Sequence, residues 1–189
     1  MPRAGLTHTV VVEAAEQMID DPDAGPLTLA ALAALFGVKQ QSLYKHIDGI
    51  DDLRRSIAVR AKLELADVMA RAAVGKAGGD AITAMSLSYR KWAAAHPGRY
   101  AATVRAPITA DAEDAAASLE ITKVAFEVMS GFGLQGDDAV HAIRGLRAGL
   151  HGFVTLEAAG GFGLSVDIDR SFDRLLAGLL AGITERANS

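Results

Sequence analysis

The sequence contains no cysteine, which excludes disulfide bonds, thiolate metal sites and a cysteine nucleophile. Aromatic residues make up only 5% of the chain, and none of the five prolines follows Pro107. Because proline interrupts helices, this distribution leaves room for long ones. No run of about 18 uncharged apolar residues indicates a membrane span, and the N-terminus lacks the pattern of a secretory signal. We therefore expect a cytoplasmic protein that does not bind membranes.

Positive charge is also scarce. The net charge is −4, and up to residue 53 three basic residues stand against eight acidic ones. Phosphate binding draws on clustered lysine and arginine, so this composition argues mildly against a nucleic-acid partner. The balance improves only when Arg54, Arg55, Arg60 and Lys62 are included. Nucleic-acid binding must therefore be argued from where the basic residues lie.

Small and aliphatic residues are abundant instead. Half of the residues are hydrophobic, and few segments show the alternation of a β-strand. Helical periodicity and turn residues predict an all-α protein, with helices at about 7–19, 28–36, 39–46, 48–74, 81–95, 98–105, 106–129, 137–159 and 167–186.

The segment 28–47, TLAALAALFGVKQQSLYKHI, has the pattern of a helix-turn-helix. Ala33 would allow two helices to cross closely, and Gly37 can adopt the positive φ that a tight corner requires. The apolar residues that would anchor the two helices are Leu32, Phe36, Val38, Leu43 and Ile47. With these buried, the second helix turns a polar face outward.

That polar face consists of residue types that read DNA. Glutamine pairs with adenine and lysine with guanine, while serine, tyrosine and lysine bind phosphates. The residues on the face are Lys39, Gln40, Gln41, Ser42, Lys45 and His46. A solvated helical hairpin inside an ordinary bundle would show the same pattern, so these residues alone leave both interpretations open.

The longer segment 27–53, LTLAALAALFGVKQQSLYKHIDGIDDL, resembles the DNA-binding domain of the TetR family of bacterial transcriptional regulators. The matching positions are Thr28, Ala33, Gly37, Val38, Leu43, Tyr44, His46 and Leu53. The resemblance implies a three-helix, helix-turn-helix DNA-binding domain at 1–53. A larger C-terminal helical bundle at 54–189 would bind a ligand and form the dimer.

The resemblance also implies roles for the polar residues. Base edges would be read by Lys39, Gln40 and Gln41. The full predicted DNA-binding set is Thr28, Lys39, Gln40, Gln41, Ser42, Tyr44, Lys45, His46 and Arg54. The sequence departs from the family where Ile47 replaces an aromatic residue and Ile50 replaces a phosphate-binding lysine. Losing that lysine should weaken DNA affinity, unless Arg54 or Arg55 supplies the contact.

Segments 89–105 and 145–163 resemble a WHG-type C-terminal domain of the same family, which retains its His-Gly pair here but not its tryptophan. Because glycine destabilises a helix, clustered glycines indicate that another backbone approaches closely. The predicted dimer interface comprises Gly145, Gly149, Gly152, Ala177, Gly178, Ala181 and Gly182. Packing within one subunit is the alternative.

A ligand pocket is expected among the middle helices. Its candidate residues are Met85, Tyr89, Trp92, Tyr100, Phe126, Met129, Arg147 and His151. The same apolar residues could equally form ordinary core, and His151 could be purely structural. No motif for a nucleophile, a phosphate loop or a zinc site occurs, so we predict no catalytic residue, metal or cofactor.

Together these features predict a DNA-binding transcriptional regulator, released as a repressor from a palindromic operator by a small molecule, and acting as a homodimer. The first alternative is a helical small-molecule-binding module without sequence-specific DNA recognition, favoured by Ile50 and the acidic N-terminal region. A helical enzyme comes third, since it would need a polar cluster inside the C-terminal region.

Overall fold

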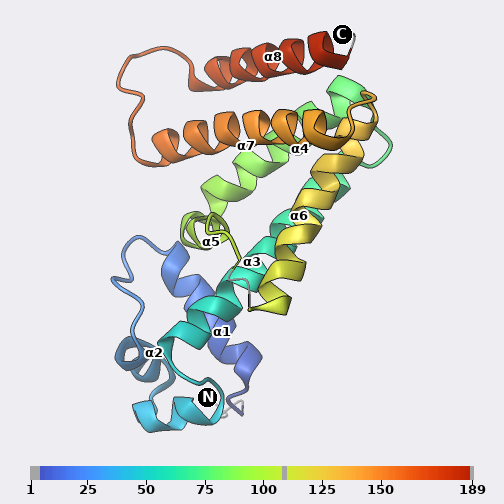
Figure 1. Ribbon diagram of the computed structural model, residues 1–189. Helices are drawn as coiled ribbons and strands as arrows, with labels where there is room; N and C mark the ends of the chain where they lie inside the picture. Colours follow the sequence, from blue (N-terminus) through green and yellow to red (C-terminus); the bar gives the residue numbers. More distant parts are fainter. Residues whose placement is uncertain (1–4, 108–109, 188–189) are drawn as a thin grey trace. The chain divides into compact units, whose positions relative to one another are not determined.

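The structure is a computed structural model that describes residues 5–107 and 110–187 (Figure 1). Over these residues all regular secondary structure is helical and no strand occurs, which confirms the all-α prediction. Its elements are α1 (His8–Asp20), α2 (Leu29–Phe36), the 3₁₀ helix η1 (Gln40–Lys45), α3 (Ile50–Ala73), α4 (Gly78–Ala95), α5 (Pro97–Thr103), α6 (Ala112–Ser130), α7 (Gly136–Ala158) and α8 (Ile168–Ala187).

Local hydrogen bonds set several helix starts. The hydroxyl oxygens of Thr7 and Thr28 accept bonds of 3.3 and 3.1 Å from backbone amides three residues later. The Asp167 carboxylate accepts from the amides of the second and third residues after it, at 2.8 and 3.2 Å. Such caps satisfy amides that have no partner within the helix. Helix α6 begins at Ala112, later than predicted; residues 108–109 of the predicted opening lie outside the described residues.

The chain divides into two compact units that do not follow one cut in the sequence. The first unit comprises residues up to 63 together with 95–118, and the second comprises 64–94 and 119 onward. Helices α3 and α6 each contribute residues to both units. The functional boundary predicted at residue 53 thus stays a prediction, and the structural units divide elsewhere.

In the first unit, α1, α2, η1 and the start of α3 share one core. Its fully buried residues include Val11, Leu32, Leu43 and Leu53. Helix α5 packs against the end of α1, where a Cβ atom added at Gly98 would lie 2.0 Å from the Ile19 carbonyl oxygen. No side chain therefore fits at Gly98 without a shift of backbone.

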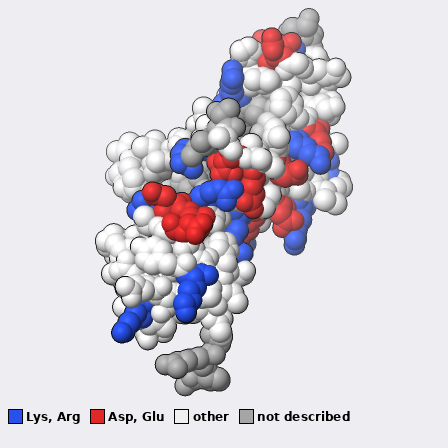
Figure 2. Space-filling view, turned by 60° about the horizontal axis from the view of Figure 1, so that its bottom comes forward, with Lys and Arg blue, Asp and Glu red and all other residues white. Residues whose placement is uncertain are grey.

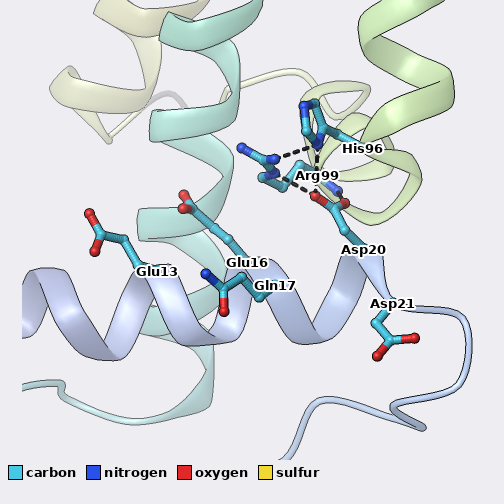
Figure 3. A pocket seen from close by; sticks show the side chains of 7 residues that line it. All are labelled: Glu13, Glu16, Gln17, Asp20, Asp21, His96 and Arg99. Atoms are coloured by element: carbon cyan, nitrogen blue, oxygen red, sulfur yellow. Dashed lines mark hydrogen bonds and ion pairs between the residues drawn. The ribbon is translucent and has the colours of Figure 1, made fainter.

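Ion pairs join α1 to α5 at the same junction. Figure 3 shows Asp20 pointing from the end of α1 toward His96 and Arg99. The Asp20 carboxylate accepts hydrogen bonds from Arg99 Nε at 2.6 Å and from the Arg99 backbone amide at 2.9 Å. His96 Nδ1 lies 3.3 Å from the same carboxylate. These contacts hold a segment from the middle of the chain on the N-terminal helices.

Helix α3 is tied to the start of α6 by charged side chains. Arg55 donates from Nη2 to Asp111 at 2.6 Å and to Glu113 at 2.8 Å. Hydrogen bonds from Arg55 lower the pKa of Asp111 to about 2, and the same bonds raise the pKa of Arg55. Two turns further along α3, Lys62 Nζ contacts Asp114 Oδ1 at 2.5 Å, and both side chains are almost fully buried.

In the second unit, Arg90 of α4 holds the α7–α8 hairpin. Its guanidinium group forms ion pairs with Glu157 of α7 at 2.5 Å and with Asp169 of α8 at 2.8 Å. It also lies over the rings of Phe153 and Phe172, 5.3 and 4.8 Å from their centroids. The hydrogen bond to Glu157 raises the pKa of Arg90. Burial among aromatic rings and paired charge together fix the two last helices on α4.

Candidate nucleic-acid interface

The corner between α2 and η1 has the geometry that the sequence predicts. Gly37 ends α2 in the left-handed region, with φ 63° and ψ 33°. The Gly37 amide donates to the Ala34 carbonyl and the Val38 amide to the Ala33 carbonyl, each at 3.0 Å. This pair of bonds is a Schellman motif, which closes a helix and redirects the chain. The second helix of the helix-turn-helix, η1, is thereby directed away from α2.

Burial of two residues orients η1. Leu43 is fully buried, and Ile47, just beyond the element, is 3% exposed in the same core. Five neighbouring side chains consequently face solvent, and we refer to them as the reading face: Lys39, Gln40, Gln41, Tyr44 and Lys45. Ser42 and His46 are half-buried beside it. Figure 2 shows isolated basic side chains among uncharged residues at the lower end of the molecule.

The flanking residues of the predicted interface differ in their availability. Thr28 is exposed at the start of α2, where its hydroxyl oxygen is already engaged as the helix cap. The Arg54 side chain is 62% exposed, while Arg55 is held by Asp111 and Glu113. Ile50 is half-buried against the core that contains Leu43. Of the two arginines considered as substitutes for a lysine at position 50, Arg54 is the more accessible.

The predicted ligand-binding residues do not form one buried cluster. In the second unit, Met85, Tyr89, Trp92 and Met129 are buried, whereas Tyr100 is buried in the first unit. Phe126 is 38% exposed because Val124, Val128 and Met129 occupy the inward positions of α6. Arg147 is exposed, and His151 is half-buried with Nδ1 3.4 Å from the Thr155 hydroxyl. Phe126 and Arg147 thus lie outside the buried part of the second unit, and the ligand-binding role of the eight residues stays a prediction.

An apolar groove that the sequence analysis missed lies elsewhere in the second unit. It has a volume of about 380 Å³, and its lining residues include Ala73, Val74, Lys76, Val124, Glu127 and Val128. None of the predicted ligand-binding residues lines it. The groove is built from the end of α3, the start of α4 and the second half of α6, so no local sequence pattern could reveal it.

The small residues predicted at the dimer interface divide into two groups. An added Cβ at Gly149 would lie 3.0 Å from Leu179 of the same chain, so Gly149 accommodates the packing of α7 on α8. At Gly149 this fits the alternative of packing within one subunit, and a role in a dimer interface stays a prediction. Additional Cβ atoms at the other glycines would meet open space: Gly145, Gly152, Gly178 and Gly182. Ala177 and Ala181 are exposed beside the last two.

The described residues also bear on metal binding and membrane insertion. Among them, no group of three or more His, Asp or Glu side chains is placed to hold a metal ion. No described helix is both long enough and apolar enough to cross a membrane.

Comparisons with known proteins place these features in context. Residues 82–179, more than half of the chain, match the model of a family described as Tetracyclin repressor-like, C-terminal domain. The uncharacterized HTH-type transcriptional regulator Rv0681 of Mycobacterium tuberculosis is 36% identical over 97% of this chain and 84% of its own length. The uncharacterized HTH-type transcriptional regulator YobS of Bacillus subtilis is 34% identical over 96% of this chain and 95% of its own.

A solved structure has the same fold. The TetR family protein ActR of Streptomyces coelicolor, in complex with (S)-DNPA, superposes with a TM-score of 0.68 over 97% of this chain and 100% of its own. Its sequence identity is 18%, so this likeness concerns the fold. The sequence relatives and the family model, rather than this likeness of fold, show which family the chain belongs to. The helix-turn-helix geometry at 28–47 agrees with them.

Proposed function

This chain belongs to the TetR family of transcriptional regulators, and we propose that it is a repressor that binds a palindromic operator as a homodimer and leaves it when a small molecule binds. Its relatives Rv0681 and YobS are HTH-type transcriptional regulators, which supports a DNA-binding regulator. The observation that supports the finer proposal is the exposed reading face on η1, held outward by the buried Leu43 and Ile47. Two such faces, one per subunit, would enter major grooves about 34–36 Å apart.

Within each half-site, the side chains divide by chemistry. Lys39, Gln40 and Gln41 stand at the exposed start of η1, where they would contact base edges. Phosphates would be bound by Tyr44, which is 52% exposed, by Lys45 and, at the edge of the face, by the half-buried Ser42 and His46. Thr28 and Arg54 complete the proposed DNA-binding set, although Arg54 is ion-paired with Asp51 at 3.7 Å and that pair restrains its contact with phosphate.

Release by a small molecule is an equilibrium argument. An effector weakens DNA binding only as far as it prefers the conformation that cannot bind DNA, and by linkage the operator must weaken effector binding equally. ActR, which shares this fold, holds the small molecule (S)-DNPA in its solved complex. The buried Met85, Tyr89, Trp92 and Met129 of the second unit are the proposed wall of the effector site.

Selection from random duplex DNA by the purified protein tests operator recognition. We expect a palindrome whose half-sites are about one helical turn apart. The double substitution Lys39→Ala/Gln41→Ala should then weaken binding to that sequence by about 3 kcal/mol, because each residue supplies base contacts worth about 1–3 kcal/mol. Fluorescence anisotropy at a stated salt concentration measures the change.

The matched control is Lys91→Ala/Gln135→Ala, which removes one exposed lysine and one outward glutamine from the second unit. It should leave DNA affinity unchanged. If no sequence is enriched at low salt, or if the Lys39/Gln41 variant binds the palindrome as tightly as the wild type, sequence-specific readout by η1 is wrong. A helical small-molecule-binding module would then be the better description.

Substitutions on the exposed small-residue face test the homodimer. Gly178→Arg/Ala181→Arg should convert the dimer to a monomer in sedimentation velocity, because two charged side chains cannot be buried in an interface without partners. Open space around Gly178 leaves room for arginine within one subunit. Ala116→Arg, on the exposed side of α6, is the control and should remain dimeric. A double variant that still sediments as a dimer would contradict the proposed interface.

A further inference from the structure

The first turn of α3 borders the reading face. Helix α3 starts at Ile50, five positions after the end of η1 at Lys45. Ile47, Ile50 and Leu53 all pack into the core that buries Leu43, so this turn is held beside η1. A duplex seated on the reading face would therefore bring its sugar-phosphate backbone close to the start of α3.

The start of a long helix ordinarily attracts phosphate, because its free amides and its dipole present positive charge. In α3 the first turn instead holds two acids, Asp51 and Asp52. The Asp52 carboxylate accepts a 3.0 Å hydrogen bond from the Asp48 amide, so this carboxylate is engaged within the protein. The Asp51 side chain is 96% exposed, so its charge faces outward.

Asp51 also forms an ion pair with a cation of its own helix. Arg54 Nη1 lies 3.7 Å from Asp51 Oδ1, one turn further along the helix. The next residue, Arg55, is committed to Asp111 and Glu113. From position 39 to 54 the chain has three cations, Lys39, Lys45 and Arg54, and three acids, Asp48, Asp51 and Asp52. The formal charges of this segment therefore sum to zero.

We propose that Asp51 limits sequence-independent DNA binding, by repelling phosphate and by holding Arg54 away from it. The inference rests on the proposed binding of DNA by η1. A genome offers about 10⁶–10⁹ competing non-specific sites, so weak backbone binding keeps the protein available for its operator. Base contacts then supply the larger share of the affinity.

The test is Asp51→Asn, which removes the charge while keeping the side-chain shape. Dissociation constants are measured between 50 and 200 mM salt for the selected operator and for an unrelated duplex of equal length. We expect binding about five- to tenfold tighter on both duplexes at low salt. The slope of log affinity against log salt should steepen by about 1, because the freed Arg54 gains one phosphate contact.

Two further variants isolate the cause. Asp51→Asn/Arg54→Gln should lose the steeper slope and most of the gain, since Arg54 supplies the new contact. Asp80→Asn removes an exposed acid from the first turn of α4 in the second unit, and should change neither affinity nor slope. Thermal unfolding followed by circular dichroism checks that each variant is folded.

Three results would overturn the inference: unchanged affinity and slope for Asp51→Asn, a gain confined to the operator, or a steeper slope that persists without Arg54. A wild-type protein that binds neither duplex at 50 mM salt would instead refute the proposed function. The two failures are thus distinguishable, because the second is seen before any variant is compared.

Discussion

Gly98→Ala is expected to destabilise the protein by about 3 kcal/mol, although it adds a single methyl group to a short helix. The added Cβ would lie 2.0 Å from the Ile19 carbonyl oxygen and 2.8 Å from the Ile19 Cβ. Both distances are far below van der Waals contact, and the first neighbour is backbone, which cannot rotate away. Overpacking at such a site typically costs about 1–3 kcal/mol, and here α5 must move off α1. Urea unfolding followed by circular dichroism measures the loss.

Gly79→Ala provides the matched comparison. Gly79 is also the second residue of its helix, but its added Cβ would make an ordinary contact of 3.8 Å with Leu180. Alanine is favoured over glycine in helices, so this variant should be as stable as the wild type or more stable by about 0.5 kcal/mol. Equal stability of the Gly98 and Gly79 variants would mean that α5 does not pack on α1 as closely as described.

Lys62→Met is expected to have the second large effect, a loss of about 3–5 kcal/mol. Lys62 and Asp114 are 2% and 1% exposed, and their ion pair is 2.5 Å long. Methionine fills similar space but leaves the Asp114 carboxylate buried without its cation, which is the costly way to break a buried pair. Asp114 Oδ2 is also without a hydrogen-bond partner in the described part of the chain, so little else stabilises that charge.

The double variant Lys62→Met/Asp114→Leu distinguishes charge from packing. Replacing both partners by apolar residues removes the unpaired charge, so stability should return to within about 1 kcal/mol of the wild type or exceed it. Arg71→Met is the control, because its ion pair with Asp67 is exposed and worth at most about 0.5 kcal/mol. A double variant no more stable than Lys62→Met would show that the loss comes from packing and not from charge.

The two predictions concern the same structural feature. Residues 95–118, which follow the long α4, pack with the N-terminal helices rather than with the second unit. Gly98, Asp20 and Arg99 hold α5 on α1, while Arg55 and Lys62 hold the start of α6 on α3. Helix α5 and the start of α6 thus belong to the same compact unit as the elements that carry the reading face.

Helix positions and the helix-turn-helix corner could be predicted because they depend on neighbours a few residues away. Thr28 caps an amide three positions on, and Gly37 is needed for a left-handed residue at a helix end. The outward direction of Lys39 and Gln41 follows from the burial of Leu43 and Ile47. Periodicity and capping act within one or two turns, so they can be recognised in the sequence.

The sequence by itself thus determined the helices, the family resemblance and the polar face of η1. Tertiary structure decided which charges are engaged: Arg55 rather than Arg54 is held by α6, and Lys62 finds Asp114 52 positions away. It also decided that Gly98 meets Ile19, that Gly149 serves its own subunit and that Phe126 faces outward. These outcomes depend on how distant backbones pass one another, and a periodic pattern of side chains carries no information about that path.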